Sequence, residues 1–302
     1  MIPFAYRAPA TVEEALAHLR EFGEEARPLA GGTALVLMLR QRLVRSACLV
    51  NLGGIAALRR IEAQDGRLEL GACVTHREVE TNPIVRRRLP VLAETYRHVA
   101  TIRIRNVATV GGGLAHADPN QDPPPTLLAL GARVRVRGPR GERELPLDDF
   151  FTDYYQTSLT PGELVTGVSV PVPGPRTGCA FLKFLPRTAD DYATVAAAAA
   201  VTLDATGRRC ADVRIGLGCV GTTPVRATAA EDLIRGQALA DELLRAAGDA
   251  AKRGLDPIGD HRGSADYKRE MAAVFLGRAV REAWARARRA APGSRRAGGP
   301  AG

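Results

Sequence analysis

The stretch "ARPLAGGTALVLMLRQRLV", residues 26–44, passes from a short apolar run through two glycines and a threonine into a periodic apolar segment. It predicts a strand over 26–30, a tight loop over 31–33 and a helix over 34–44. Upstream, "TVEEALAHLREFG" (11–23) predicts a helix that begins at a capping box of Thr11 and Glu14. Downstream, the apolar run "CLVNL" (48–52) predicts a buried strand, so the first part of the chain is predicted to be a small α/β unit.

The middle of the chain predicts a second unit made of strands and helices. A strand is expected over 66–75, helix over 83–100, and a strand with one wet face within 126–138, where Val134 and Val136 alternate with arginines. The segment 162–173 predicts a strand pair or an extended edge. The proline and glycine residues of "PVPGPRTG" (171–178) then mark a domain boundary.

Beyond that boundary the pattern is strands followed by two helices, at about 229–253 and 265–288. That order predicts an antiparallel sheet covered on one face by helices. The run Ala196–Ala200 has helical propensity, but the flanking valines and threonine favour a strand, which is our prediction. The residues from 289 onward are expected to be disordered.

Composition excludes several classes of protein. The chain has 302 residues and a formal net charge of +9, but its basic residues are mostly arginines spread along the whole sequence, which disfavours nucleic-acid binding. The five cysteines contain no C-x-x-C pair, so a structural zinc site or an iron–sulfur cluster within this chain is not expected. The sequence has no export signal or membrane span, and a cytoplasmic location is expected.

The glycines at 31 and 32 open the first candidate site. A strand that runs into Gly-Gly-Thr and a helix presents consecutive backbone N–H groups, which favour a phosphate. The third glycine of a dinucleotide fingerprint is missing, and no acidic residue follows about 20 positions on. No Lys-Ser or Lys-Thr pair follows the glycines either, so neither classical NAD binding nor a Walker loop is predicted.

The second candidate site is "ATVGGGLAHADPNQD", residues 108–122, which we expect to be a loop. A metal site built from His116, Asp118 and Asp122 is disfavoured, because no second histidine lies nearby. General acid–base work by His116 lacks a partner at a suitable spacing, and a plain structural loop remains possible. We prefer a loop that binds phosphate and sugar, with Asp122 accepting a hydrogen bond from a ribose hydroxyl or a similar donor.

Several segments, taken in their order, resemble one family. They are "RPLAGGTALV", "IRNVATVGGGLAHADPNQDPPPTLLALGARV", "SLTPGELVTGVSVP", "FLKFLPRTADDYATVAAAAAV" and "GLGCVGTTPVRA". This set is similar to the FAD-binding medium subunit of the molybdenum hydroxylases, the group that includes xanthine dehydrogenase and carbon monoxide dehydrogenase. The resemblance covers about residues 1 to 285.

The resemblance implies an α+β fold. A vanillyl-alcohol-oxidase-type FAD-binding domain of two α/β subdomains would span 1–55 and 56–174. A C-terminal antiparallel-sheet-and-helix domain would span 175–288, followed by a disordered tail over 289–302. It also implies which residues meet FAD: Arg27, Leu29, Ala30, Gly31, Gly32, Thr33, Ala34 and Leu35 around the pyrophosphate; Thr109, Val110, Gly111, Gly112, Gly113 and His116 as a second wall; and Asp122, Leu164, Val165, Lys183, Asp191 and Tyr192 as further contacts.

The implied function is electron transfer. FAD would collect electrons from [2Fe–2S] clusters on a small subunit, while a large molybdopterin subunit oxidises the substrate. The resemblance also implies that the three subunits assemble as a dimer of heterotrimers. No catalytic side chain is expected in this chain; Lys183 and Tyr192 would tune the flavin. The alternatives are a free-standing flavin oxidoreductase of the same fold and a degenerate scaffold subunit.

Three positions depart from the family pattern. Ala34 stands where an acid or a hydroxyl is usual, Gly113 where asparagine is usual, and Asp118-Pro119 where Ser-Pro is usual. Each lost side chain removes a cofactor hydrogen bond worth on the order of 1 kcal/mol. Loops that bind mainly through main-chain amides are expected to tolerate these losses.

Overall fold

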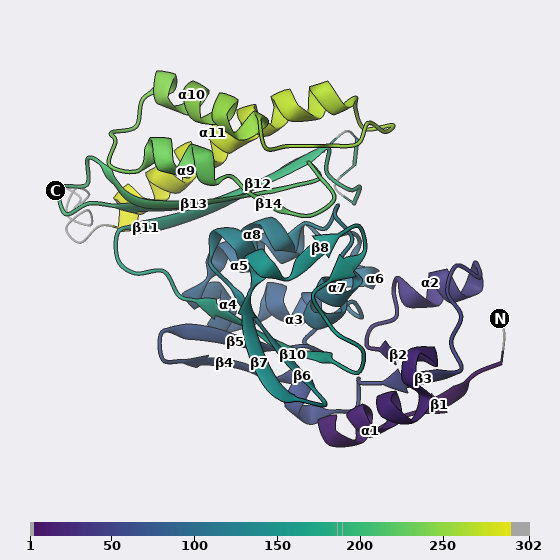
Figure 1. Cartoon of the computed structure of the whole chain (residues 1–302). Coiled ribbons are helices and arrows are strands. Elements are labelled where there is room, and N and C mark those ends of the chain that lie inside the picture. Colours follow the sequence, from purple (N-terminus) through teal and green to yellow (C-terminus); the bar gives the residue numbers. More distant parts are fainter. Residues whose placement is uncertain (1–2, 186, 189, 291–302) are drawn as a thin grey trace. The chain divides into compact units, whose positions relative to one another are not determined.

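The polypeptide crosses between two structural units three times, after Asp118, Gly131 and Pro171. The structure is a computed structural model that describes residues 3–185, 187–188 and 190–290 (Figure 1). Unit 1 contains the described residues up to Asp118 and the segment Ala132–Pro171. Unit 2 contains Pro119–Gly131 and the described residues from Val172 onward. The predicted boundaries at 55 and 174 stay predictions, and most of the predicted tail lies outside the described residues.

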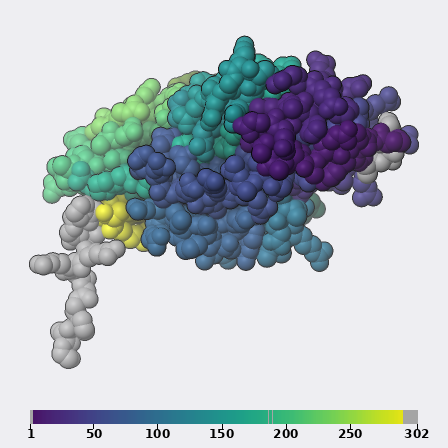
Figure 2. Space-filling view, turned by 90° about the horizontal axis from the view of Figure 1, so that it is seen from below, coloured from purple at the N-terminus to yellow at the C-terminus, as the bar shows by residue number. Residues whose placement is uncertain are grey.

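Unit 1 begins with a three-stranded parallel sheet. Its strands are β1 (Ala5–Arg7), β2 (Ala26–Leu29) and β3 (Cys48–Asn51), in the order β1-β3-β2. The helices are α1 (Val12–Phe22) and α2 (Leu35–Arg40). This is the predicted strand, loop, helix and strand, although α2 ends four residues before the predicted limit. In Figure 2 the purple surface of this segment adjoins the blue surface of later residues in the same unit.

The capping residues of α1 behave nearly as predicted. The Thr11 hydroxyl accepts from the Glu14 N–H at 3.1 Å. The Glu14 carboxylate reaches back to the N–H of Ala10 at 2.7 Å, one residue before the cap. Both bonds satisfy helix-end amides that would otherwise lack an acceptor.

The second sheet of unit 1 has five antiparallel strands. These are β4 (Ile61–Gln64), β5 (Arg67–Gly71), β6 (Arg133–Gly138), β7 (Gly141–Pro146) and β10 (Leu164–Pro171), in the order β4-β5-β10-β6-β7. The prediction of a strand pair or edge over 162–173 is therefore wrong, because β10 is a single central strand. A small hairpin, β8 (Phe151–Asp153) and β9 (Gln156–Thr157), precedes it.

The two faces of this sheet differ as the alternation in β6 predicted. Val134 and Val136 are fully buried on one face. On the other face Arg133 pairs with Glu144 at 2.9 Å, and Arg135 pairs with Glu69 at 3.2 Å. Successive side chains of a strand point to opposite faces of the sheet, so the same strands carry ion pairs on one face and apolar core residues on the other.

Five helices complete unit 1: α3 (His76–Thr81), α4 (Pro83–Arg88), α5 (Pro90–Arg97), α6 (Ile102–Arg105) and α7 (Val110–His116). The region 83–100 is helical as predicted. The stretch 108–122 is a loop only in part: α7 contains all three of its glycines, whereas residues 117–122 form the predicted loop. The Thr109 hydroxyl caps this helix by accepting from the Gly112 N–H.

Unit 2 is an antiparallel sheet with helices on both faces. Its strands are β11 (Thr177–Phe184), β12 (Val195–Leu203), β13 (Cys210–Gly218) and β14 (Val225–Arg226), in that order. The helices are α8 (Pro123–Ala129), α9 (Thr228–Ile234), α10 (Asp241–Lys252) and α11 (Ala265–Ala290). The Ala196–Ala200 run is a strand, as predicted. The helix expected over 229–253 is two helices, and α11 continues two residues into the predicted tail.

Close contacts show how both faces are covered. A Cβ on Gly178 of β11 would lie 2.1 Å from the Ala283 carbonyl oxygen of α11. A Cβ on Gly216 of β13 would lie 2.1 Å from the Pro125 carbonyl oxygen of α8. Gly178 pairs with Val201 and Gly216 pairs with Ala198, which point to opposite faces of β12. The prediction of a sheet covered on one face is therefore wrong, because α8 covers the second face (Figure 1).

Candidate functional site

The segment between β2 and α2 presents a row of unpaired backbone donors. Gly32 has a φ of +69°, a conformation that glycine adopts without strain. Within the described part of the chain, the N–H groups of residues 31–35 have no hydrogen-bond acceptor. These residues are half-buried. Consecutive free amides in a glycine turn are suited to the oxygens of a phosphate.

The two glycine segments lie against each other within unit 1. A Cβ on Gly31 would lie 1.9 Å from the carbonyl oxygen of Val107, and a Cβ on Gly112 would lie 3.7 Å from the Ala30 side chain. Main chain therefore packs on main chain at Gly31, and no other residue fits there without displacing its neighbour. The structure thus brings together two segments that the sequence analysis placed at one site.

The second glycine segment uses its amides inside the protein. The N–H groups of Val110 and Gly111 donate to the carbonyls of Val74 and Ala72, both at 2.9 Å. Those of Gly112 and Gly113 donate to the hydroxyl and the carbonyl of Thr109. Its glycines also serve packing, since a Cβ on Gly111 would lie 2.5 Å from the Ala72 side chain. The contribution of residues 109–113 to a cofactor site stays a prediction.

His116 ends α7 beside an aromatic side chain that the sequence analysis missed. The rings of His116 and Tyr155 have centroids 5.1 Å apart and an interplanar angle of 52°. Burial lowers the pKa of His116, and the nearby Asp118 opposes this. Burial therefore favours the neutral form of this imidazole. Tyr155 has a φ of +52°, and nothing in the local sequence indicates that it meets His116.

Asp122 and Lys183 form a buried ion pair in unit 2. Lys183 Nζ lies 2.8 Å from Asp122 Oδ2, and both side chains are almost wholly buried. Burial raises the pKa of Asp122 to about 6, and Lys183 opposes this. Among the described residues, Asp122 Oδ1 is buried and has no hydrogen-bond partner. A buried acceptor without a donor is costly, so this oxygen is suited to a donor from a ligand.

The remaining predicted residues have varied surroundings. Tyr192 is half exposed, and the Arg262 guanidinium lies 5.6 Å from its ring centroid. The Asp191 carboxylate accepts from the Thr188 N–H at 3.2 Å. Leu164 and Val165 are buried, and Leu164 belongs to the core around α1 and β3. The Arg27 guanidinium donates to the carbonyl of Glu24 at 2.6 Å. The cofactor role of all these residues stays a prediction.

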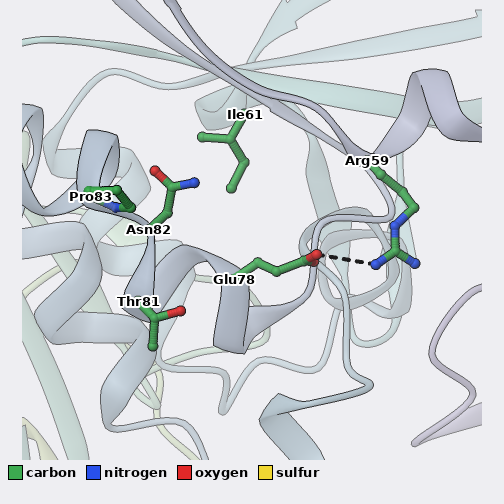
Figure 3. Close-up of a pocket in the computed structure, with 6 residues that line it drawn as sticks. All are labelled: Arg59, Ile61, Glu78, Thr81, Asn82 and Pro83. Carbon is green, nitrogen blue, oxygen red and sulfur yellow. Dashed lines mark hydrogen bonds and ion pairs between the residues drawn. The ribbon is translucent and has the colours of Figure 1, made fainter.

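One surface pocket of unit 1 involves none of the predicted residues. It is lined by Arg59, Ile61, Glu78, Thr81, Asn82 and Pro83 (Figure 3). Glu78 faces Arg59 across it at 3.1 Å and also accepts from the N–H of Thr75, which completes the capping box of α3. Asn82 Oδ1 in turn accepts from the Ile84 N–H at 2.8 Å, so the carboxylate and the amide oxygen that line the pocket both serve as helix caps.

Two family models cover most of the chain. "FAD binding domain in molybdopterin dehydrogenase" matches residues 2–173, and "CO dehydrogenase flavoprotein C-terminal domain" matches residues 180–283. Unit 1 ends at Pro171, two residues before the end of the first match, and β11 begins between the two matches. The first model contains both glycine segments and Asp122, and the second contains Lys183 and Tyr192.

Characterised relatives match along nearly their whole length. The carbon monoxide dehydrogenase medium chain of Hydrogenophaga pseudoflava is 37% identical over 288 residues, which are 95% of this chain and 99% of the relative. The nicotine 6-hydroxylase medium subunit of Paenarthrobacter nicotinovorans is 35% identical over 281 residues, 93% of this chain and 97% of the relative.

Solved structures have the same fold. Carbon monoxide dehydrogenase from Hydrogenophaga pseudoflava, in a form that lacks the Mo-pyranopterin moiety of the molybdenum cofactor, matches with a TM-score of 0.91 and 38% identity, over 95% of this chain and 99% of that one. Quinoline 2-oxidoreductase from Pseudomonas putida 86 matches with a TM-score of 0.88 and 35% identity, over 95% and 98%. The chain therefore belongs to the family of FAD-binding medium subunits of the molybdenum hydroxylases, the oxidoreductases that include xanthine dehydrogenase and carbon monoxide dehydrogenase.

Proposed function

We propose that this subunit carries electrons from [2Fe–2S] clusters on a small partner subunit, through its FAD, to an external acceptor. A large partner subunit with the molybdopterin cofactor would oxidise the substrate. The family membership supports this proposal, since the relatives are named as medium chains or medium subunits of dehydrogenases and hydroxylases. The row of free amides at residues 31–35 is the structural observation that carries it.

Two features of this chain fit FAD. The amides of residues 31–35 would hold the pyrophosphate, because they are half-buried, consecutive and without acceptors among the described residues. Binding through the main chain explains why Ala34 can replace a polar residue. In unit 2, the free oxygen Asp122 Oδ1 would accept from a hydroxyl or N–H group of the cofactor. Both features are sites for groups that FAD possesses.

Lys183 would set the charge near the cofactor. FAD supplies the redox chemistry, because its ring system can accept electrons singly and release them in pairs. The Lys183 ammonium is buried against Asp122, so its charge is held in a fixed place. A fixed positive charge favours an anionic reduced ring over a neutral oxidised one. Lys183 and Asp122 are thus proposed to hold charge, with no proton transfer to the substrate.

The proposal predicts a coloured protein. We expect the purified chain to absorb visible light as a flavoprotein and to bleach with dithionite. Gly31→Ala should abolish flavin retention, because its Cβ would collide with the Val107 carbonyl. Gly174→Ala is the matched control, because a Cβ there meets open space. A wild-type chain that is colourless and takes up no added FAD would instead favour the scaffold alternative.

The assembly is also a proposal. We expect one large, one small and one medium chain, doubled into a dimer of heterotrimers in the cytoplasm. No described helix is long and apolar enough to cross a membrane. Isolating the native complex and measuring molybdenum, iron and flavin tests this. An active, solitary chain without molybdenum or iron would favour the free-standing oxidoreductase instead.

A further inference from the structure

The short helix α3 holds the segment 99–110 at both of its ends. At its N-terminal end, the His76 N–H donates to the Ala108 carbonyl at 2.9 Å, and Thr75 forms a β-bridge with Thr109. The His76 ring also bonds the Thr109 carbonyl at 3.2 Å. These contacts fix the residues just before α7.

At the C-terminal end of α3, Glu80 holds the segment through an ion pair. Glu80 lies 3.0 Å from Arg105 Nε and 2.8 Å from Arg77 Nη1. Arg105 Nη1 also donates to the carbonyls of Val99 and Ala100, at 3.0 and 2.7 Å. The Glu80 side chain is 8% exposed and that of Arg105 is 12% exposed. Ala100 has a φ of +39°, which is unfavourable for alanine and needs such support.

What these contacts position is the carbonyl of Val107. The N–H groups of Val107 and Ala108 both donate to the Ile104 carbonyl, so these two residues are tied to the end of α6. The Val107 carbonyl occupies the space where a Cβ on Gly31 would stand. The place of α6 therefore determines what lies behind the free amides of residues 31–35. Those amides donate to no acceptor within the described protein. The loop is held instead by its carbonyls, since Gly32 accepts from the Val36 N–H, and by the packing of Gly31 on Val107.

We infer that Glu80 and Arg105 are positioning residues for the phosphate-binding loop at 31–35. They contact no ligand; they act through α6 and the Val107 carbonyl. The effect on FAD binding rests on the proposed function, whereas the effect on the order of the loop does not. Removing either charge leaves the other buried with fewer partners, which loosens the segment.

The test uses the full chain with Glu80→Gln, Arg105→Gln and Arg105→Lys. The control is Glu231→Gln in unit 2, where Glu231 is fully buried and bonds Arg226 at 2.7 Å and the Ile215 N–H at 2.8 Å. The control should lower thermal stability in a similar way without touching the loop. Three quantities are measured for each variant: the melting temperature, hydrogen–deuterium exchange of the peptide spanning 29–36, and the dissociation constant for FAD.

We expect faster exchange at 29–36 and about tenfold weaker FAD binding in the Glu80→Gln and Arg105→Gln variants, as for other supporting residues behind a ligand site. Arg105→Lys should restore part of both, and Glu231→Gln should change neither. Equal exchange and equal FAD affinity in all variants would overturn the inference, as would the same losses in the control. If the wild type binds no FAD, the proposed function fails, while the exchange measurement still decides the positioning role.

Discussion

His76 carries a neutral imidazole in the interior of unit 1. It is almost fully buried, bonds the Thr109 carbonyl through Nε2 and packs edge-on against Tyr96. Burial lowers its pKa from 6.5 to about 4. In the unfolded chain the ring takes up a proton near pH 6.5, so the unfolded state binds more protons between pH 6.5 and 4. Stability is therefore full above pH 6.5 and falls as the pH falls towards 4.

This gives a prediction for acid stability. The wild type should lose on the order of 3 kcal/mol of unfolding free energy from this group between pH 7 and pH 4. His76→Gln keeps a donor for Thr109 but cannot take up a proton, so its loss over the same range should be smaller by that amount. Urea unfolding at several pH values checks this. Parallel pH profiles for the two proteins would show that His76 is not the titrating group.

The Asp122–Lys183 pair gives a prediction of opposite sign. Lys183→Met leaves the Asp122 carboxyl buried without its cation, and breaking such a pair costs about 3–5 kcal/mol. The pKa of Asp122 is already raised by burial, and the loss of Lys183 raises it further. Because the pKa of this carboxyl is higher in the folded state than in the unfolded state, the folded state binds more protons between the two pKa values. The stability of the variant is therefore highest at low pH and is lost as the pH rises.

Denaturant unfolding at pH 5 and pH 8 measures this effect. The difference between the wild type and Lys183→Met should be larger at pH 8. The double variant Asp122→Asn with Lys183→Met should remove most of the extra loss, because no charge is then buried alone. A loss that is the same at both pH values would mean that the lost packing of Lys183, rather than its charge, matters.

Residue-level predictions from sequence succeeded where a local rule applied. The cap at Thr11 and the alternation around Val134 follow from neighbours a few positions apart. The bond between Lys183 and Asp122 joins residues 61 positions apart. The local sequence indicated Asp122 as a cofactor contact, but only the family resemblance indicated Lys183. The roles of His76 and Arg105 depend on which segments meet in space, which no local pattern states.

At the scale of elements, the glycines in α7 show why the second candidate site was misread. Three successive glycines usually favour a loop, because glycine gives up more backbone freedom in a helix than other residues do. Here the Thr109 cap and the close approach of Gly111 to Ala72 outweigh that preference. A tertiary contact, absent from the local sequence, decided the structure of the element.

Strand β12 supports a prediction about its alanines. Ala199 is 1% exposed and lies on the face that α11 covers, the face where Gly178 approaches the α11 backbone. Ala199→Ile should cost about 1–3 kcal/mol through overpacking. Ala200 is half-buried and points the other way, so Ala200→Ile is expected to change stability by no more than about 0.5 kcal/mol.

Unfolding midpoints in urea compare the two variants directly. Because both substitutions add the same side chain to the same strand, strand propensity cancels in the comparison. Equal effects would show that the packing of α11 on β12 leaves room for the larger side chain, against the short distances at Gly178.

For the whole molecule, the two family models and the two structural units do not divide the chain identically. The first model includes residues 119–131, whereas α8 packs in unit 2. Arg214 of β13 donates to the Leu128 carbonyl of α8 at 3.1 and 3.2 Å, and Gly216 allows Pro125 to approach. Sequence reasoning identified the fold class and the second domain, but it could not assign α8 because packing, rather than chain order, decides its place.

A fragment that begins at Val172 tests the role of α8. It lacks the helix that covers the second face of β12 and β13, so we expect it to bind a hydrophobic dye and to unfold without a cooperative transition. Adding a fragment of residues 1–171, which carries α8, should restore cooperative unfolding, measured by circular dichroism. A stable, cooperative fragment of unit 2 alone would show that α8 contributes little.

The excursion of the chain through α8 has a consequence for how this subunit can evolve. Two domains joined by one linker can be exchanged, duplicated or encoded separately, because each carries its whole core with it. Here a gene split between residues 171 and 180 would leave part of unit 2 in the upstream product. Recombination at that point is expected to give a stable protein only when the α8 of one parent sequence packs well on the unit 2 sheet of the other. The sequences of α8 and of this sheet should therefore change together during evolution.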